Sequence, residues 1–180
     1  TGNVNPSSGT MSLSIPDNSA SGGFSLLKVT GIPAGATITD VSINFRITHN
    51  NDGDLVINLK GPNGNVLNIA NRIGGTGHNY GASGNNTIVS SSSTTSITTA
   101  TAPFNATAYS PQAAGAVVGA TTVTNNISNV NRFSGLYGST ASSANGNWIV
   151  SVRDDATGTS GTLINWQIVI SYATITNSSP

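Results

Sequence analysis

Residues 144–172 constrain the fold more than any other part of the chain, because they hold two alternating apolar runs joined by a polar turn. Each run places its large apolar side chains on one face: Trp148, Val150 and Val152 in the first, Trp166, Ile168, Ile170 and Tyr172 in the second. A period of two residues is typical of strands that are buried on one side. The segment therefore predicts an all-β sandwich with both tryptophans in its core.

Short strands separated by turn residues are predicted along the rest of the chain. They cover Met11–Ile15, Phe24–Val29, Ile38–Thr48, Leu55–Lys60 and Val66–Ala70, with room for one more in 117–127. Residues 55–70 are expected to form a hairpin, since Gly61-Pro62-Asn63-Gly64 has the composition of a tight turn. The pattern weakens over 71–111, which is predicted as a long loop; functional, packed and mobile loops all remain open here.

The composition excludes several classes of partner. Charged residues make up 7% of the chain and are balanced, with six cations and six anions. The six cations are scattered singly, so neither nucleic acid nor an anionic membrane is an expected partner. No run of 18 apolar residues is present, so membrane insertion is not expected. Ser, Thr and Asn form about two fifths of the chain, a composition common in secreted bacterial modules.

Every acidic residue is an aspartate, and five of the six occur in turn-like sequence: Asp17, Asp52, Asp54, Asp154 and Asp155. Aspartate is favoured in turns because its side chain bonds the nearby backbone. Loops rich in Asp, Asn and Gly can also supply the oxygen ligands that calcium requires. Turn formation and calcium binding are both open for these five residues.

No catalytic constellation is evident. The chain has two histidines and no cysteine, and it contains no G-x-S-x-G motif and no paired histidine spacing for zinc. His49 directly follows a predicted strand, where a hydrogen-bonding role is the simpler expectation. We therefore expect no catalytic residues in this chain.

Four motifs in order resemble those of P domains, also called P/Homo B domains, which follow the catalytic domain of proprotein convertases and of many bacterial subtilisin-like proteases. Residues 47–64, with ITH, GDL and GPNG, are similar to the family's ITH…GDL tract. The IPDN of residues 15–18 and the GGTG of 74–77 resemble two further family motifs. Residues 146–166 resemble the closing tract with its two tryptophans.

The resemblance implies a jelly-roll-like β-sandwich of about eight or nine short antiparallel strands. It places the P domain at 11–173, between an N-terminal linker at 1–10 and a C-terminal tail at 174–180. It further implies a secreted, non-catalytic accessory domain that stabilises or regulates a subtilisin-like catalytic domain. That catalytic domain would be in the same precursor or in trans. The accessory domain would also contribute to binding of a protein or glycan substrate. Calcium is an implied cofactor, although His78, Asn85 and Asn86 depart from the acidic positions of the family loop.

A carbohydrate-binding or adhesion module is the rival interpretation, because similar sandwiches often bind sugars. Such a surface needs exposed aromatic rings. Tyr80, Tyr109 and Tyr137 lie in predicted loops and are the candidates.

Overall fold

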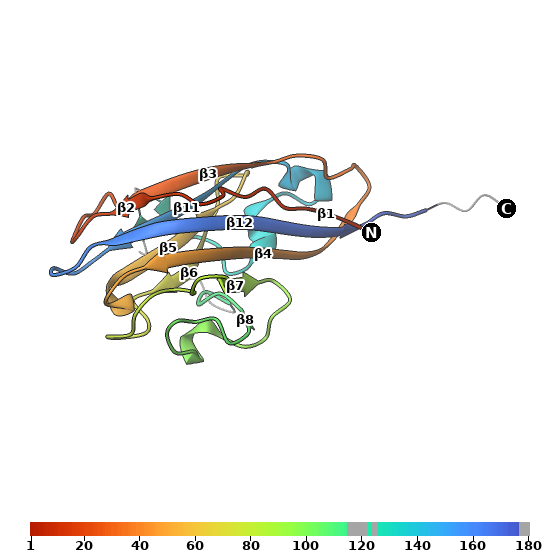
Figure 1. Cartoon of the computed structure of the whole chain (residues 1–180). Coiled ribbons are helices and arrows are strands. Elements are labelled where there is room, and N and C mark those ends of the chain that lie inside the picture. Colours follow the sequence, from red (N-terminus) through yellow and green to blue (C-terminus); the bar gives the residue numbers. More distant parts are fainter. Residues whose placement is uncertain (115–121, 124–125, 177–180) are drawn as a thin grey trace.

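Two β-sheets lie face to face in the computed structural model, which describes residues 1–114, 122–123 and 126–176 (Figure 1). The six-stranded sheet has the order β1 (Gly2–Val4), β12 (Gly161–Ala173), β4 (Thr37–Thr48), β7 (Thr87–Ser90), β8 (Ala108–Tyr109), with β2 (Leu13–Ile15) also paired to β12. The four-stranded sheet has the order β3 (Gly23–Val29), β11 (Gly146–Asp154), β5 (Leu55–Lys60), β6 (Val66–Asn71). The predicted β-sandwich is confirmed.

The remaining elements are short. β9 (Thr122–Val123) and β10 (Asn126–Ile127) pair with each other. Four 3-10 turns complete the set: η1 (Asp52–Asp54), η2 (Ile97–Thr99), η3 (Phe133–Leu136) and η4 (Ala141–Ala144). Within the described part of the chain, no helix is long and apolar enough to cross a membrane.

Both tryptophans lie in the core between the sheets, as their alternation predicts. Trp148 on β11 is 0% exposed and Trp166 on β12 is 1% exposed. Each indole N–H has a partner: Trp148 Nε1 donates to the Ala144 carbonyl at 3.0 Å, and Trp166 Nε1 donates to Ser25 Oγ at 2.9 Å. Because Ser25 is on β3, the second bond joins the two sheets. A buried polar group that keeps its hydrogen bond avoids the desolvation cost of an unpaired one.

Residues 71–111 are packed against the core instead of forming a loose loop. Buried side chains hold this segment in place: Tyr80, Val89, Ile97, Phe104 and Tyr109. Tyr80 stacks on Phe104 with ring centroids 4.5 Å apart. The segment also contributes β7 and β8, which were not predicted because this part of the sequence is rich in Ser and Thr and lacks apolar alternation. These two strands pair in parallel. With them the described residues hold twelve strands, more than the predicted eight or nine.

The N-terminal end of the chain differs from the predicted bounds, whereas β12 ends at Ala173, the predicted end of the domain. Residues 1–10 are not a linker, because Gly2–Val4 pairs with β12 and the Ser8 N–H donates to the Trp166 carbonyl at 2.9 Å. A Cβ on Gly2 would lie 2.6 Å from the Tyr172 ring, so glycine lets β1 approach β12. In the predicted tail, residues 177–180 lie outside the described residues. In the strand predicted within 117–127, only 122–123 and 126–127 are described.

Candidate functional site at the aspartate-rich end of the sandwich

All five predicted aspartates lie in turns or at strand ends at one end of the sandwich. Asp17 follows β2, Asp52 and Asp54 form η1 between β4 and β5, and Asp154 and Asp155 close β11. Two contacts between turns bring them to this common end. The Asp155 N–H donates to the Asp54 carbonyl at 2.8 Å, and the Gly158 N–H donates to Asp17 Oδ1 at 2.9 Å.

The carboxylates have separate partners at this end. Both oxygens of Asp17 accept from the Gly158 N–H, and Asp154 Oδ1 accepts from the Ala156 N–H at 3.0 Å. Asp155 pairs with Arg153, with Nε and Oδ1 at 3.0 Å. Among the residues that the structure places, no three His, Asp or Glu side chains gather where they could hold a metal ion. Calcium takes about 6–8 oxygen ligands, and backbone carbonyls and water supply many of them. A calcium site among the five aspartates stays a prediction.

Calcium removal tests this prediction. If the aspartates only form turns, the melting temperature should stay the same within about 1 °C between 5 mM calcium and excess EDTA. A site occupied in the folded state alone adds about 2.7 kcal/mol at 100 times the dissociation constant, which would raise the melting temperature by several degrees. If EDTA lowered the melting temperature of the wild type by several degrees but left that of Asp52→Asn unchanged, Asp52 would be identified as a calcium ligand.

His49 and Asp154 form a buried pair that joins the end of β4 to the end of β11. His49 Nε2 lies 3.0 Å from Asp154 Oδ2, and both side chains are 0% exposed. The other ring nitrogen, Nδ1, lies 2.9 Å from the Asn51 carbonyl and 3.1 Å from the Asn51 nitrogen. The predicted hydrogen-bonding role of His49 is confirmed. The pairing with Asp154 was not foreseen, because 105 residues separate the two in the sequence.

The environment of His49 does not suit nucleophilic catalysis. A polar hollow of about 160 Å³ lies beside it, lined among others by Ser160. A histidine base needs one ring nitrogen free to take the hydroxyl proton. Here Asp154 and Asn51 engage both nitrogens, and the Thr159 hydroxyl lies 3.4 Å from Nε2 in a marginal contact. The pair is arranged to hold two strand ends together.

Asp52 is the one candidate aspartate whose carboxylate is buried and accepts no hydrogen bond of good geometry from the described residues. Its side chain is 0% exposed, and neither oxygen meets a donor in hydrogen-bonding geometry. The glycine loop 74–77 covers it, through backbone bonds from Asp52 N–H to the Gly77 carbonyl and from Gly53 N–H to the Gly75 carbonyl, both at 2.8 Å. Gly74 (φ +89°) is required here, because a Cβ would lie 2.7 Å from the Phe104 ring.

Burial raises the pKa of Asp52 from its ordinary 3.8 to about 7, and the nearby backbone N–H of Asn79 partly opposes this. The pKa of the buried Tyr80 hydroxyl is raised well above its ordinary value, first by burial and then by the Asp52 charge. The Tyr80 hydroxyl also has no hydrogen-bond partner among the placed residues. The fold therefore favours the protonated, neutral form of Asp52.

Stability is expected to fall as the pH rises, because of Asp52. Below about pH 4 the carboxyl is protonated in both states, so it has no effect. Between about pH 4 and 7 the unfolded chain loses this proton and the folded chain keeps it, which costs about 2–4 kcal/mol by pH 8. Urea melts at pH 5 and pH 8 measure the loss. Asp52→Asn, which cannot ionise, should remove most of the difference; an unchanged difference in that variant would exclude Asp52 as its cause.

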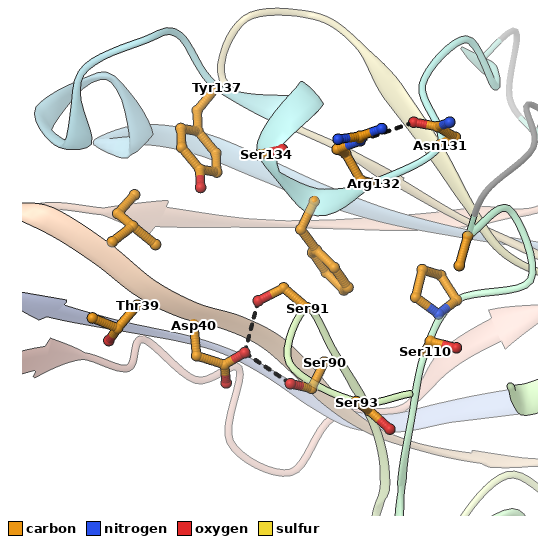
Figure 2. A pocket seen from close by; sticks show the side chains of 14 residues that line it. Thr39, Asp40, Ser90, Ser91, Ser93, Ser110, Asn131, Arg132, Ser134 and Tyr137 are labelled. Atoms are coloured by element: carbon orange, nitrogen blue, oxygen red, sulfur yellow. Dashed lines mark hydrogen bonds between the residues drawn. The ribbon is translucent and has the colours of Figure 1, made fainter. Parts of the chain in front are cut away.

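The tyrosines do not form the predicted aromatic platform. Tyr80 is 0% exposed and Tyr109 is 4% exposed, so neither ring is accessible to a sugar. Tyr80 lies in a loop that packs inward, and Tyr109 lies on strand β8, which is the reason for the error. Tyr137 alone is half-buried, lying 6.4 Å from Trp148 between ring centroids, and it lines a hollow of about 250 Å³ (Figure 2).

Asp40 in the same hollow was not identified from the sequence. Its Oδ1 accepts from Ser90 Oγ at 2.8 Å, from Ser91 Oγ at 2.7 Å and from the Ser92 N–H at 3.1 Å (Figure 2). These bonds attach the turn after β7 to β4. The sequence signal that could have identified Asp40 is its position within a predicted strand and outside any turn, where aspartate is uncommon.

Comparison with known proteins confirms the resemblance seen in the motifs. Residues 38–102 match the family model of the proprotein convertase P-domain, from β4 to the loop after η2. Leupeptin-inactivating enzyme 1 of Streptomyces exfoliatus is 36% identical over 70 residues, which are 39% of this chain and 16% of that protein. This chain therefore spans less than a fifth of that relative.

Two solved structures of the Aeromonas sobria serine protease resemble the chain. The protease in complex with the chaperone ORF2 aligns with a TM-score of 0.48 and 15% identity, over 98% of this chain and 28% of that chain. The protease crystallised by itself aligns with a TM-score of 0.46 and 18% identity, over 94% of this chain and 27% of that chain.

Proposed function

We propose that this chain is the P domain of a secreted bacterial subtilisin-like protease, in which it stabilises or regulates the catalytic domain without taking part in the chemistry. The match of residues 38–102 to the P-domain model carries the proposal. The predicted bounds of 11–173 extend the proposed domain over the sandwich except for β1, which lies at Gly2–Val4. The catalytic domain, in the same precursor or in trans, is the proposed partner.

The geometry supports a non-catalytic role. His49 has both ring nitrogens engaged, so it lacks the free nitrogen with which a triad histidine activates serine. The aspartates of this end bond turns and strand ends, and Asp52 lies under the glycine loop, away from solvent. Such an arrangement suits a rigid supporting domain.

Thermal inactivation of the natural full-length polypeptide tests the accessory role. We expect deletion of residues 11–173 to shorten the half-life of its hydrolytic activity at elevated temperature at least tenfold. His49→Ala in the full-length protein should shorten the half-life as well, and His78→Ala, at an exposed loop histidine, is the matched control. An unchanged half-life after the deletion, or a full-length product without peptidase activity, would contradict the proposal.

A further inference from the structure

One strand of the six-stranded sheet has an open edge. β7 pairs with β4 over Ser42–Phe45, and the ladder continues one step, because the Ser91 N–H donates to the Val41 carbonyl at 2.8 Å. β4 itself extends back to Thr37 and pairs there with β12 alone. Among the described residues, the stretch Thr37–Asp40 therefore has a strand neighbour on one side and no paired strand on the other.

Thr39 is an extra residue within this open stretch. In the register with β12, Asp40 pairs with Ser171 and Ile38 pairs with Tyr172, which leaves Thr39 without a partner strand residue. Its side chain is exposed. A bulge of this kind leaves the extra residue out of the ladder. Within the described part of the chain, this edge of β4 thus has no paired strand over Thr37–Asp40, and Thr39 lies outside the ladder with β12.

A groove runs along the open edge. Two hollows, of about 250 Å³ and 370 Å³, share Ile38, Ser134 and Tyr137 and together extend along residues 36–40. Figure 2 shows Thr39 and Asp40 on one side of the first hollow, with Tyr137, Ser134 and Arg132 on the other. The edge of β4 is one wall of the groove, and residues 132–141 form the opposite wall.

We propose that an extended segment of another polypeptide binds in this groove as an added strand beside Thr37–Asp40. Exposed strand edges recruit peptides through main-chain hydrogen bonds, while flanking pockets take alternate side chains. The added strand would continue the sheet where β7 ends. This inference goes beyond the accessory role and does not depend on it.

The side chains of the groove define the chemistry of the segment. One carboxylate, Asp40, and one guanidinium, Arg132, line the first hollow, and no charged residue lines the second. These two opposite charges balance, and Asp40 already accepts three hydrogen bonds, so the groove has no net charge to select an ionic ligand. Ile38 and Tyr137 at its centre suit an apolar side chain. The partner is therefore an uncharged peptide with an apolar residue in its middle, and about four of its residues would pair with Thr37–Asp40.

Peptide titration followed by amide NMR tests the inference. The probe is the blocked heptapeptide acetyl-Thr-Ser-Thr-Leu-Thr-Ser-Thr-amide. We expect it to shift the amide signals of Thr37–Asp40 and to slow their hydrogen exchange. The same peptide with alternate amides N-methylated keeps every side chain but loses main-chain donors, so it should bind about tenfold more weakly or not at all.

A blocking variant and its control complete the test. Ser134 is exposed and lines both hollows, so Ser134→Trp should abolish the peptide shifts while the fold is retained. Ser12→Trp, at an exposed position outside the groove, should bind the peptide like the wild type.

Four results would overturn the inference. Equal binding of the N-methylated peptide would show that main-chain pairing is not used, and peptide shifts outside 36–41 would place the site elsewhere. Shifts of these amides with chitohexaose or cellohexaose, and none with peptide, would make the groove a sugar site. Concentration-dependent shifts of the same amides without peptide, together with a dimer mass by light scattering, would make a second copy of this chain the occupant.

Discussion

Trp148→Ala is expected to lower the free energy of unfolding by about 3–5 kcal/mol. Trp148 is 0% exposed at the centre of β11, where the sheets pack against each other, and its removal leaves a large cavity. The indole N–H bond to Ala144, which fixes the end of η4, is lost as well. Urea denaturation followed by far-UV circular dichroism measures the change.

Phe24→Ala is the matched control for this substitution. Phe24 is an aromatic residue on the adjacent strand β3 but is 57% exposed, so its truncation should change stability by about 0.5 kcal/mol or less. A loss below 1 kcal/mol for Trp148→Ala, or an equal loss for both variants, would contradict the central position of Trp148 in the core.

His49→Ala is expected to cost about 3–5 kcal/mol, because it leaves the Asp154 carboxylate buried without its partner. Asp154 is 0% exposed, and after the substitution it keeps only the Ala156 N–H among the bonds described above. Urea melts of His49→Ala, Asp154→Ala and the double variant form a cycle. The double variant should be clearly more stable than the sum of the single losses predicts, since it removes both members of the pair.

His78→Ala controls for the loss of an imidazole. His78 is exposed in the glycine-rich loop, so a change of more than about 0.5 kcal/mol is not expected. Additive losses around the cycle would show that His49 and Asp154 do not depend on each other, which contradicts the pair.

The strands with strict alternation could be predicted from the sequence. Leu55–Lys60 was predicted with its bounds, and β4 and β3 each begin one residue earlier than expected. The reason is physical: a strand that buries one face repeats its apolar residues at every second position. The tryptophans could be placed in the core for the same reason, because each lies on the apolar face of its alternating run and buries a large side chain there.

Elements held by polar side chains could not be predicted. β7 ends in a serine-rich turn that Asp40 fixes from 50 residues away, and no local pattern signals that contact. Tyr80 and Tyr109 were expected on the surface because their loops are polar, but packing against Phe104 and the rest of the core decided otherwise. β1 was missed because a three-residue strand gains its stability from β12 and not from its own sequence.

The aspartates show the same limit at the candidate site. All five could be identified from the sequence. Asp154 bonds its own local backbone, since it accepts from the Ala156 N–H two residues later, whereas Asp17 accepts from the distant Gly158 N–H. The burial of Asp52 depends on the glycine loop some 22–25 residues later, whose path over η1 no spacing rule provides. The turn-like surroundings of the aspartates could be predicted from the sequence, but the burial of Asp52 by a loop distant in the sequence could not.

Hydrolysis by the isolated 180-residue protein tests the central claim most directly. Fluorescent casein and a set of peptide p-nitroanilides should be cleaved no faster than in buffer, because His49 is bonded at both ring nitrogens. Turnover that copurifies with the protein and disappears in His49→Asn or Ser160→Ala would contradict the account, since it would require a working nucleophile at the aspartate-rich end.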